Sequence, residues 1–172
     1  MLQPTFKCSF SRNYWLLLLL LGVMQPFLFA QNSGDAIFNE SVLHRVELQF
    51  EQSNYLDQLL TNHRTSPIGT VPYIIASVTI DGEVLDSIGA RFKGFTSFGG
   101  VGDKYPFKLD FNEYVPGRRF DGLRKLNLNN STGDPSLHRD PVSYKVMRDM
   151  GVPASRTSFA EVFVNGELWG IY

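Results

Sequence analysis

Cysteine is almost absent from this sequence, and its absence excludes several kinds of site. Cys8 is the one cysteine among 172 residues, and it lies in a basic and apolar N-terminal segment. Such a segment is typical of a signal peptide that is cleaved off. Without it the chain has no thiol, so disulfides, cysteine-ligated zinc and thiol catalysis are excluded. The exported chain then depends on its hydrophobic core, or on ligands, for stability.

An excess of charge of one sign is also absent, with 16 basic against 17 acidic residues. We therefore expect no nucleic-acid partner. The histidines His44, His63 and His138 lie in unrelated segments without an HExxH-type spacing, so we expect no histidine-ligated catalytic zinc and assign no metal-binding residue. Ser97 lies in "FTSFG", which lacks the G-x-S-x-G elbow of serine hydrolases.

Long apolar runs are missing apart from one near the N-terminus. Lys7 and Arg12 precede an apolar run over residues 14–24, and small Ala30 follows. This is the layout of a secretory signal peptide over residues 1–30, and the run is shorter than the roughly 18 apolar residues of a membrane span. We expect a secreted, periplasmic or cell-envelope protein without membrane contact after cleavage, and an uncleaved anchor is the alternative.

Residues 31–43 are polar and read as a connector, and the remainder predicts an α+β fold with a mostly antiparallel sheet and one or two helices. Alternating apolar residues predict strands, and the dipeptides Asp81-Gly82 and Asn165-Gly166 predict tight hairpins. The expected elements, in order, are a strand in "HRVELQF", a helix in "EQSNYLDQLLTNHR", paired strands in "YIIASVTIDGEVLDSIGARF", strands in "YPFKLDF" and "GLRKLNLNN", a helix in "DPSLHRDPVSYKVMRDMG" and a hairpin in "SFAEVFVNGELWGIY".

The second predicted helix carries signals at both ends. Asp134 is placed to cap it, with Pro135 at the first helical position and Gly151 at the end. Pro141 interrupts the pattern near the start. We expect this proline to shift or kink the first turn, because it lacks an N–H and clashes with the preceding turn.

A stretch rich in glycine and basic residues, "GARFKGFTSFGGVGDKYPFKLDF" (89–111), is the strongest candidate for a ligand site. Glycines let the backbone approach anionic oxygens, and lysines then neutralise the charge. Its spacing matches neither a P-loop nor a dinucleotide fingerprint. Strands flank it on both sides, as they flank the glycine-rich loop of kinases. The alternative is that the glycines only serve hairpin turns.

A polar cluster, "NLNNSTGDPSLHRD", follows. Asn and Asp favour turns and helix caps, so a capped helix after an Asn-rich turn is the simpler interpretation. The alternative is functional: on a helix packed behind the sheet, Arg139 or Asp140 would pair with a strand lysine, as a helix carboxylate does in kinases.

Five motifs occur in order: "VTIDGEVLDSIGARFKGFTSF", "KYPFKLDFNEY", "RRFDGLRKLNLNN", "DPSLHRDPVSYKVMRDMGVPA" and "FVNGELWGIY". Together they resemble the spore coat protein H (CotH) kinase family over residues 44–172. The resemblance implies the N-lobe of a divergent two-lobed kinase fold. It also implies an atypical kinase that uses ATP and a divalent metal, Mg or Mn, to phosphorylate Ser or Thr of coat or other exported proteins.

The same resemblance implies a set of nucleotide-binding residues. Lys108 is our first choice for the lysine that holds the α and β phosphates, and Lys104 is the second. The full set is Lys108, Lys104, Lys93, Arg91, Gly94 and Ser97. The family usually has small polar residues where this chain has Phe95 and Thr96, which lowers the polarity of the loop.

In the family, the motif "VNGELWGIY" precedes a glutamate-bearing strand and the lobe that carries the catalytic and metal-binding aspartates. We therefore expect the catalytic residues beyond Tyr172, so that this chain is an incomplete fragment that is inactive alone. The alternative is a noncatalytic exported scaffold or surface-binding module with a degenerate kinase-like lobe.

Overall fold

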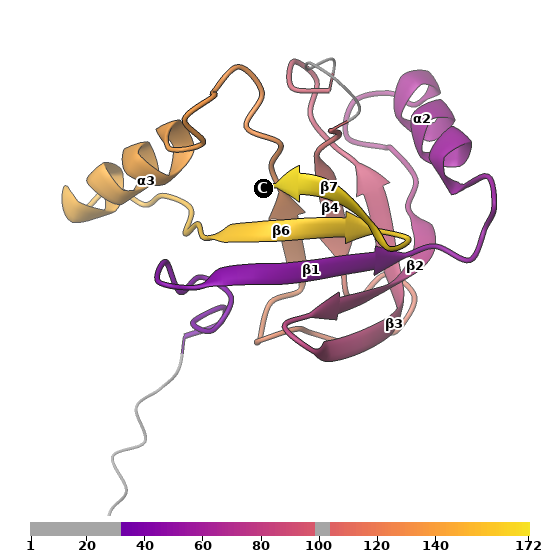
Figure 1. Cartoon of the computed structure of the whole chain (residues 1–172), viewed down its shortest axis with the longest axis horizontal. Helices are drawn as coiled ribbons and strands as arrows, with labels where there is room; N and C mark the ends of the chain where they lie inside the picture. Colours follow the sequence, from indigo (N-terminus) through magenta and orange to yellow (C-terminus); the bar gives the residue numbers. More distant parts are fainter. Residues whose placement is uncertain (1–31, 99–103) are drawn as a thin grey trace, which may run out of the picture. The chain divides into compact units, whose positions relative to one another are not determined.

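The computed structural model describes residues 32–98 and 104–172, so the predicted signal peptide lies outside the described residues. One curled sheet holds seven strands in the order β5-β4-β3-β2-β1-β6-β7 (Figure 1). Neighbouring strands are antiparallel except β1 and β6, which are parallel. The prediction of an α+β fold with a mostly antiparallel sheet is confirmed.

The elements are β1 Leu43–Gln49, α2 Tyr55–Thr65, β2 Ile74–Ile80, β3 Glu83–Phe92, β4 Phe107–Asp110, β5 Lys125–Leu128, α3 Arg139–Asp149, β6 Phe159–Val164 and β7 Glu167–Ile171.

Both predicted hairpin turns are confirmed. Asp81 and Gly82 have φ of 50° and 90°, and Asn165 and Gly166 have φ of 49° and 86°. Two successive residues with positive φ form the type I′ turn, whose twist suits a two-residue connection between antiparallel strands. Glycine tolerates this conformation without a steric cost. The turns therefore fix the registers of β2 with β3 and of β6 with β7.

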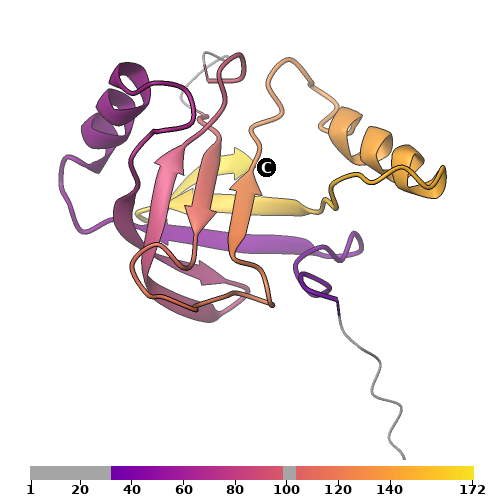
Figure 2. The ribbon, with the colours of Figure 1, turned by 180° about the vertical axis from the view of Figure 1, so that it is seen from behind.

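The core lies on one face of the curled sheet. Val46 and Leu48 of β1 and the following Phe50 are buried, as the alternation in "HRVELQF" predicts. Phe107 and Phe111, in and just after β4, are also buried. Helix α2 packs against β2 and β3 and buries its central leucine. Because alternate residues point to opposite faces, the remaining residues of β3, β4 and β5 form a second face, called here the outer face, which includes Arg91, Lys108 and Asn127. Figure 2 shows the backbone of these strands from behind.

Helix α3 begins at Arg139, later than predicted. Pro141 is the third residue of this helix, where a backbone N–H has no partner within the helix anyway. Asp134 still shapes the entry, because its Oδ2 accepts the N–H of Arg139 at 2.8 Å and its Oδ1 accepts the hydroxyl of Ser136 at 2.6 Å. The predicted end is confirmed at Gly151, which has φ of 77°.

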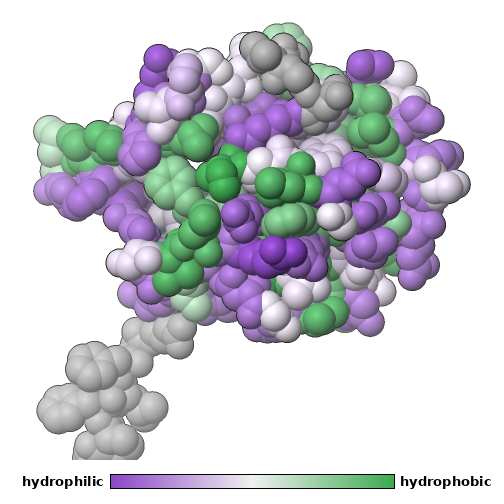
Figure 3. All heavy atoms as spheres, viewed as in Figure 1, coloured by the Kyte–Doolittle hydropathy of each residue, from purple (hydrophilic) through white to green (hydrophobic). Residues whose placement is uncertain are grey.

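Helix α3 has no buried residue, and within the described part of the chain it packs against no strand and no other helix. The alternative interpretation, a helix packed behind the sheet, was therefore wrong. Its apolar residues, among them Val142, Val146 and Met147, are exposed instead (Figure 3). Among the described residues, neither helix has the length and apolar character that a bilayer span requires.

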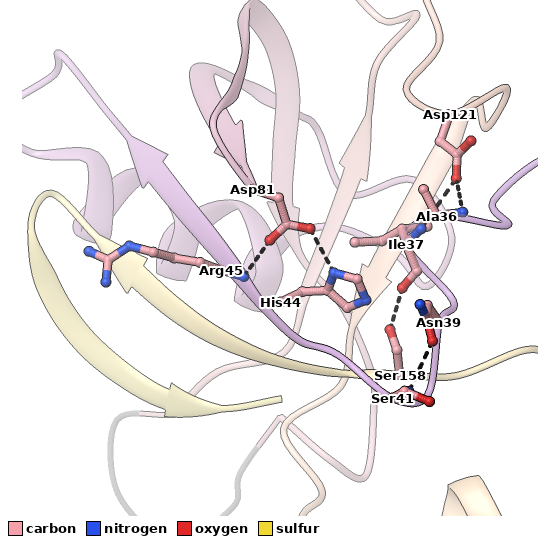
Figure 4. A network of polar contacts seen from close by, with 9 residues as sticks. All are labelled: Ala36, Ile37, Asn39, Ser41, His44, Arg45, Asp81, Asp121 and Ser158. Atoms are coloured by element: carbon pink, nitrogen blue, oxygen red, sulfur yellow. Dashed lines mark hydrogen bonds and ion pairs between the residues drawn. The ribbon is translucent and has the colours of Figure 1, made fainter.

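The segment before β1 is attached to the sheet, although it was predicted as a simple connector. Residues 32–42 form turns, and Ile37 is buried in the core. Asp121 Oδ2 accepts the backbone N–H groups of Ala36 and Ile37 at 2.8 and 3.2 Å, and the hydroxyl of Ser158 donates to the Ile37 carbonyl at 2.5 Å (Figure 4). These bonds hold the segment in place, although it contains no helix or strand.

The β2–β3 turn is also bound to the start of β1 (Figure 4). The buried His44 places Nδ1 2.7 Å from Asp81 Oδ2, and the backbone N–H of Arg45 donates to Asp81 Oδ1 at 2.8 Å. Burial raises the pKa of Asp81, but the bonds from Arg45 and His44 lower it more, so that the pKa of this carboxyl lies below its ordinary value. The ionised carboxylate therefore stabilises the turn.

Asp81→Asn is expected to lower the free energy of unfolding more at pH 7 than at pH 3. The ordinary pKa of Asp is about 3.9. Because the pKa of Asp81 is lower in the fold, its ionised form contributes stability above about pH 4, and this contribution is lost as the pH falls through the lowered pKa. Urea unfolding of both proteins at the two pH values measures the difference. An equal loss at both values would contradict the role of the charge.

Candidate functional site

Three of the predicted nucleotide-binding residues meet on the outer face. Arg91 of β3 lies opposite Lys108 of β4, and Lys108 lies opposite Asn127 of β5. Lys93 follows Arg91 by two residues and shares its face. The sequence pattern had placed Lys108 away from the apolar layer, and this is confirmed, because its neighbours Phe107 and Leu109 are both buried. The structure thus gathers Arg91, Lys93 and Lys108 into one group, called here the cationic row.

The charges of the cationic row repel one another. Burial lowers the pKa of Lys93, repulsion from Lys108 and Arg91 lowers it further, and Asp140 of α3 opposes this. Burial, Arg91 and Lys125 likewise lower the pKa of Lys108, and Asp110 opposes this. Among the described residues, no carboxylate forms an ion pair with a member of the row. An anion bound here would relieve the repulsion.

Arg91 adds a donor that has no protein acceptor. Its Nε is buried without a hydrogen-bond partner, and its guanidinium lies 5.2 Å from the ring centroid of Tyr73. A buried donor without a partner costs free energy. A bound phosphate would instead meet the terminal N–H groups of the guanidinium, because arginine presents several N–H groups to such oxygens.

A carboxylate bounds the row at one end. Asp110 is buried, lies two residues after Lys108 on the same face and places Oδ2 3.0 Å from Lys125 Nζ and Oδ1 3.7 Å from Arg124 Nε. The charge of Lys125 is therefore already matched by a protein carboxylate. The unmatched positive charge lies at Arg91, Lys93 and Lys108.

Lys93 lies where the cationic row meets a cavity of about 340 Å³. Its Nζ donates to Asn129 Oδ1 at 2.5 Å. The cavity is bounded by β5, the first turns of α3 and the segment that leads into β6, and its polar lining includes Lys93, Lys125, Asn127, Asn129, Asp140, Tyr144 and Arg156. Lys108, our first choice from the sequence, is not part of this lining. Of the lysines that the sequence predicted to bind the nucleotide, Lys93 is therefore the one that a ligand in the cavity would meet.

Lys104 lies away from the cationic row. Its Nζ donates to the backbone carbonyl of Ile171 and lies 4.7 Å from the ring centroid of Tyr172. Burial alone lowers its pKa, without a contribution from the charges of the row. Lys104 is therefore bound to the end of β7, and the structure does not bring it together with Lys93 or Lys108.

Gly94 and Ser97 form the described beginning of the glycine-rich stretch. Gly94 has φ of 82°, and a Cβ at this position would lie 2.1 Å from Ser97 Oγ. Its carbonyl accepts the ring N–H of His63 at 2.8 Å, and the His63 ring stacks on Phe98. Gly94 is thus required by a tight turn that α2 supports. The glycines at 99, 100 and 102 lie outside the described residues.

Sequence reasoning treated Asn130 as part of a turn and missed its role at this stretch. Asn130 is buried, and its Nδ2 donates to the carbonyls of Ser97 and Lys104 at 3.0 and 2.8 Å. The hydroxyl of Thr132 also donates to the Ser97 carbonyl, at 3.0 Å. One side chain thus connects Ser97 and Lys104, which lie before and after the glycines at 99, 100 and 102 in the sequence. The Asn-rich motif indicated that these side chains bond to the backbone, but it does not identify the carbonyls that Asn130 binds.

Comparison with known proteins supports the resemblance for the part of the chain that contains this site. Residues 90–172 match the family model described as CotH kinase protein. The matched part includes Arg91, Lys93 and Lys108, the cavity residues of β5, and α3. No curated protein matches the chain. The chain is therefore similar to the CotH kinase family over its C-terminal part, and the likeness of residues 44–89 stays a prediction.

Proposed function

We propose that this chain is the nucleotide-holding part of an exported CotH-like atypical protein kinase, similar to a kinase N-lobe. The proposed reaction transfers the γ-phosphoryl group of ATP to Ser or Thr of coat or other exported proteins. The observation that supports it best is the cationic row, because its three cations form no ion pair with a carboxylate of the described residues and lie in the part that matches the family model.

The residues of the row fit a polyphosphate. Lysines and an arginine stabilise phosphate charge by charge-assisted hydrogen bonds, and ATP supplies the transferable phosphoryl group when bound. Lys93 takes the first place in this proposal, since it lines the cavity and Asp140 of α3 acts on its charge. A helix carboxylate also orients the strand lysine of protein kinases. Arg91 and Lys108 would hold further phosphate oxygens.

The described residues do not fit the divalent metal that the resemblance implies. Within residues 32–98 and 104–172, no group of three or more His, Cys, Asp or Glu side chains is arranged to hold a metal ion. We therefore derive no step through a metal. The proposal for this chain is limited to binding and orienting the nucleotide.

Lys93→Met and Lys108→Met are each expected to weaken ATP binding about tenfold. A hydrogen bond to a charged group contributes about 1.5–3 kcal/mol, and 1.4 kcal/mol corresponds to a factor of ten. The measurement is a titration of the chain with a fluorescent ATP analogue, followed by competition with ATP. Lys104→Met is the matched control, because Lys104 lies outside the row, and its affinity is expected to stay unchanged.

Unchanged affinity in both Lys93→Met and Lys108→Met would sink the assignment of the row. A loss seen only in Lys104→Met would move the nucleotide to the end of β7. If the unaltered chain does not bind ATP at all, the noncatalytic surface-binding module becomes the better interpretation.

A further inference from the structure

The cavity beside the cationic row runs along the free edge of β5. Five consecutive residues, 125–129, line it, although successive side chains of a strand point to opposite faces. A cavity can meet both faces of one strand only along an edge that no other strand occupies. β5 is the last strand on its side of the sheet, and residues 155–160 form the opposite wall.

The hydrogen-bonding pattern of β5 directs backbone groups into this cavity. The N–H of Phe111 donates to the carbonyl of Arg124 at 2.9 Å. Bonded pairs alternate along an antiparallel ladder, so Leu126 and Leu128 bond to β4 in the same register. The N–H and C=O groups of Lys125 and Asn127 therefore point away from β4. Residues 155–158, across the cavity, make no backbone hydrogen bond to them.

The side chains that line the cavity differ on its two sides. Leu126, Leu128 and Phe159 supply an apolar floor, whereas Lys93 and Lys125 lie on the side of the outer face. Asp140 is the only carboxylate among the described residues of the lining. Of the three cations there, Lys125 and Arg156 already pair with Asp110 and Asp35, so that Lys93 carries the charge without an ion pair. An occupant with acidic groups on one side and apolar groups on the other would match this charge and polarity.

We propose that an extended segment of a protein partner, with alternating acidic and apolar side chains, adds to β5 as a further strand in this cavity. Its backbone would bond to the free groups of Lys125 and Asn127, which is the general mode of recognition by strand addition. Side chains on neighbouring strands share a face, so acidic residues would lie beside Lys93 and Lys125, with apolar residues above Leu126 and Leu128. This partner site shares the cavity and Lys93 with the proposed nucleotide site, but peptide binding requires no phosphoryl transfer and is measured without ATP.

The test uses a fluorescein-labelled peptide with the repeated order Glu-Val, and fluorescence anisotropy with the full chain. We expect saturable binding of this peptide and at least tenfold weaker binding of a peptide with the same residues in a scrambled order. Equal binding of the two peptides would indicate attraction of charge alone and would overturn the proposal, as would the absence of saturable binding.

Two variants at one position separate backbone pairing from side-chain contact. Asn127→Pro removes a backbone N–H that β4 does not use, and proline is tolerated on strand edges. Asn127→Ala keeps that N–H and removes only the side chain. We expect at least tenfold weaker peptide binding for Asn127→Pro and little change for Asn127→Ala, both measured without ATP. Equal affinities of the two variants would refute strand addition.

If Asn127→Pro does not fold, as judged by circular dichroism, N-methylated peptides decide with the unaltered protein. One peptide carries methyl groups on the Glu amides and another carries them on the Val amides. Only one set of amides can face β5, so one of these peptides should lose binding and the other should keep it. Unchanged binding of both would equally refute the proposal.

Discussion

Phe107→Ala is expected to lower the free energy of unfolding by about 3–5 kcal/mol, the usual cost of removing a large buried aromatic side chain. Phe107 is fully buried in β4, and its ring centroid lies 5.0 Å from that of Phe92 and 5.4 Å from that of Trp169. Since domains are stable by only about 5–15 kcal/mol, this variant would lose much of its stability. Urea unfolding followed by tryptophan fluorescence measures the change.

Val84→Ala is the matched control, because Val84 lies on β3 but is 69% exposed. A change within about 0.5 kcal/mol is expected there. If the two variants lose similar stability, Phe107 does not lie at the centre of the core.

Asn130→Asp is expected to lower the free energy of unfolding by about 3 kcal/mol. The substitution keeps the shape of the side chain but replaces an N–H donor with a carboxylate oxygen that faces the carbonyls of Ser97 and Lys104. A buried polar group without a partner costs about 1–3 kcal/mol, and a charged group costs more. Ser97 and Lys104 would also no longer be held together, so we expect faster tryptic cleavage after Lys104. Urea unfolding measures the loss of stability.

Asn127→Asp provides the control for this second prediction. Asn127 is exposed on the outer face of β5, three residues before Asn130, so the same chemical change there should alter stability by no more than about 0.5 kcal/mol. If trypsin cleaves after Lys104 at the same rate in Asn130→Asp and in the unaltered protein, Asn130 does not hold Ser97 and Lys104 together.

Local patterns were sufficient to predict the elements and the outer face. Asp81-Gly82 and Asn165-Gly166 each specify a turn through residues that tolerate positive φ, and the alternation around Lys108 fixes which side chains leave the core. Arg91 and Lys108 could be expected on one face for the same reason. These features depend on residues within a few positions of one another.

Features that depend on distant segments could not be predicted in the same way. The parallel pairing of Leu43 with Phe159 joins strands far apart in the sequence, and no local signal specifies it. Lys104 was grouped with the other lysines, but its position depends on the end of β7, which the sequence does not place beside it. The same applies to Asn130, whose partners lie 33 and 26 residues away.

The interior position of β1 and β2 in the sheet has a consequence for how the chain can be divided. β1 and β2 connect the strands β3, β4 and β5 to the pair β6 and β7 within one sheet. The segment that matches the family model begins at residue 90, inside β3, and contains neither β1 nor β2. A shortened protein that starts there would hold two separate pieces of sheet with no strand between them. The smallest unit that can fold cooperatively is thus larger than the unit that sequence comparison detects, and biochemical work on this site requires the strands that precede it.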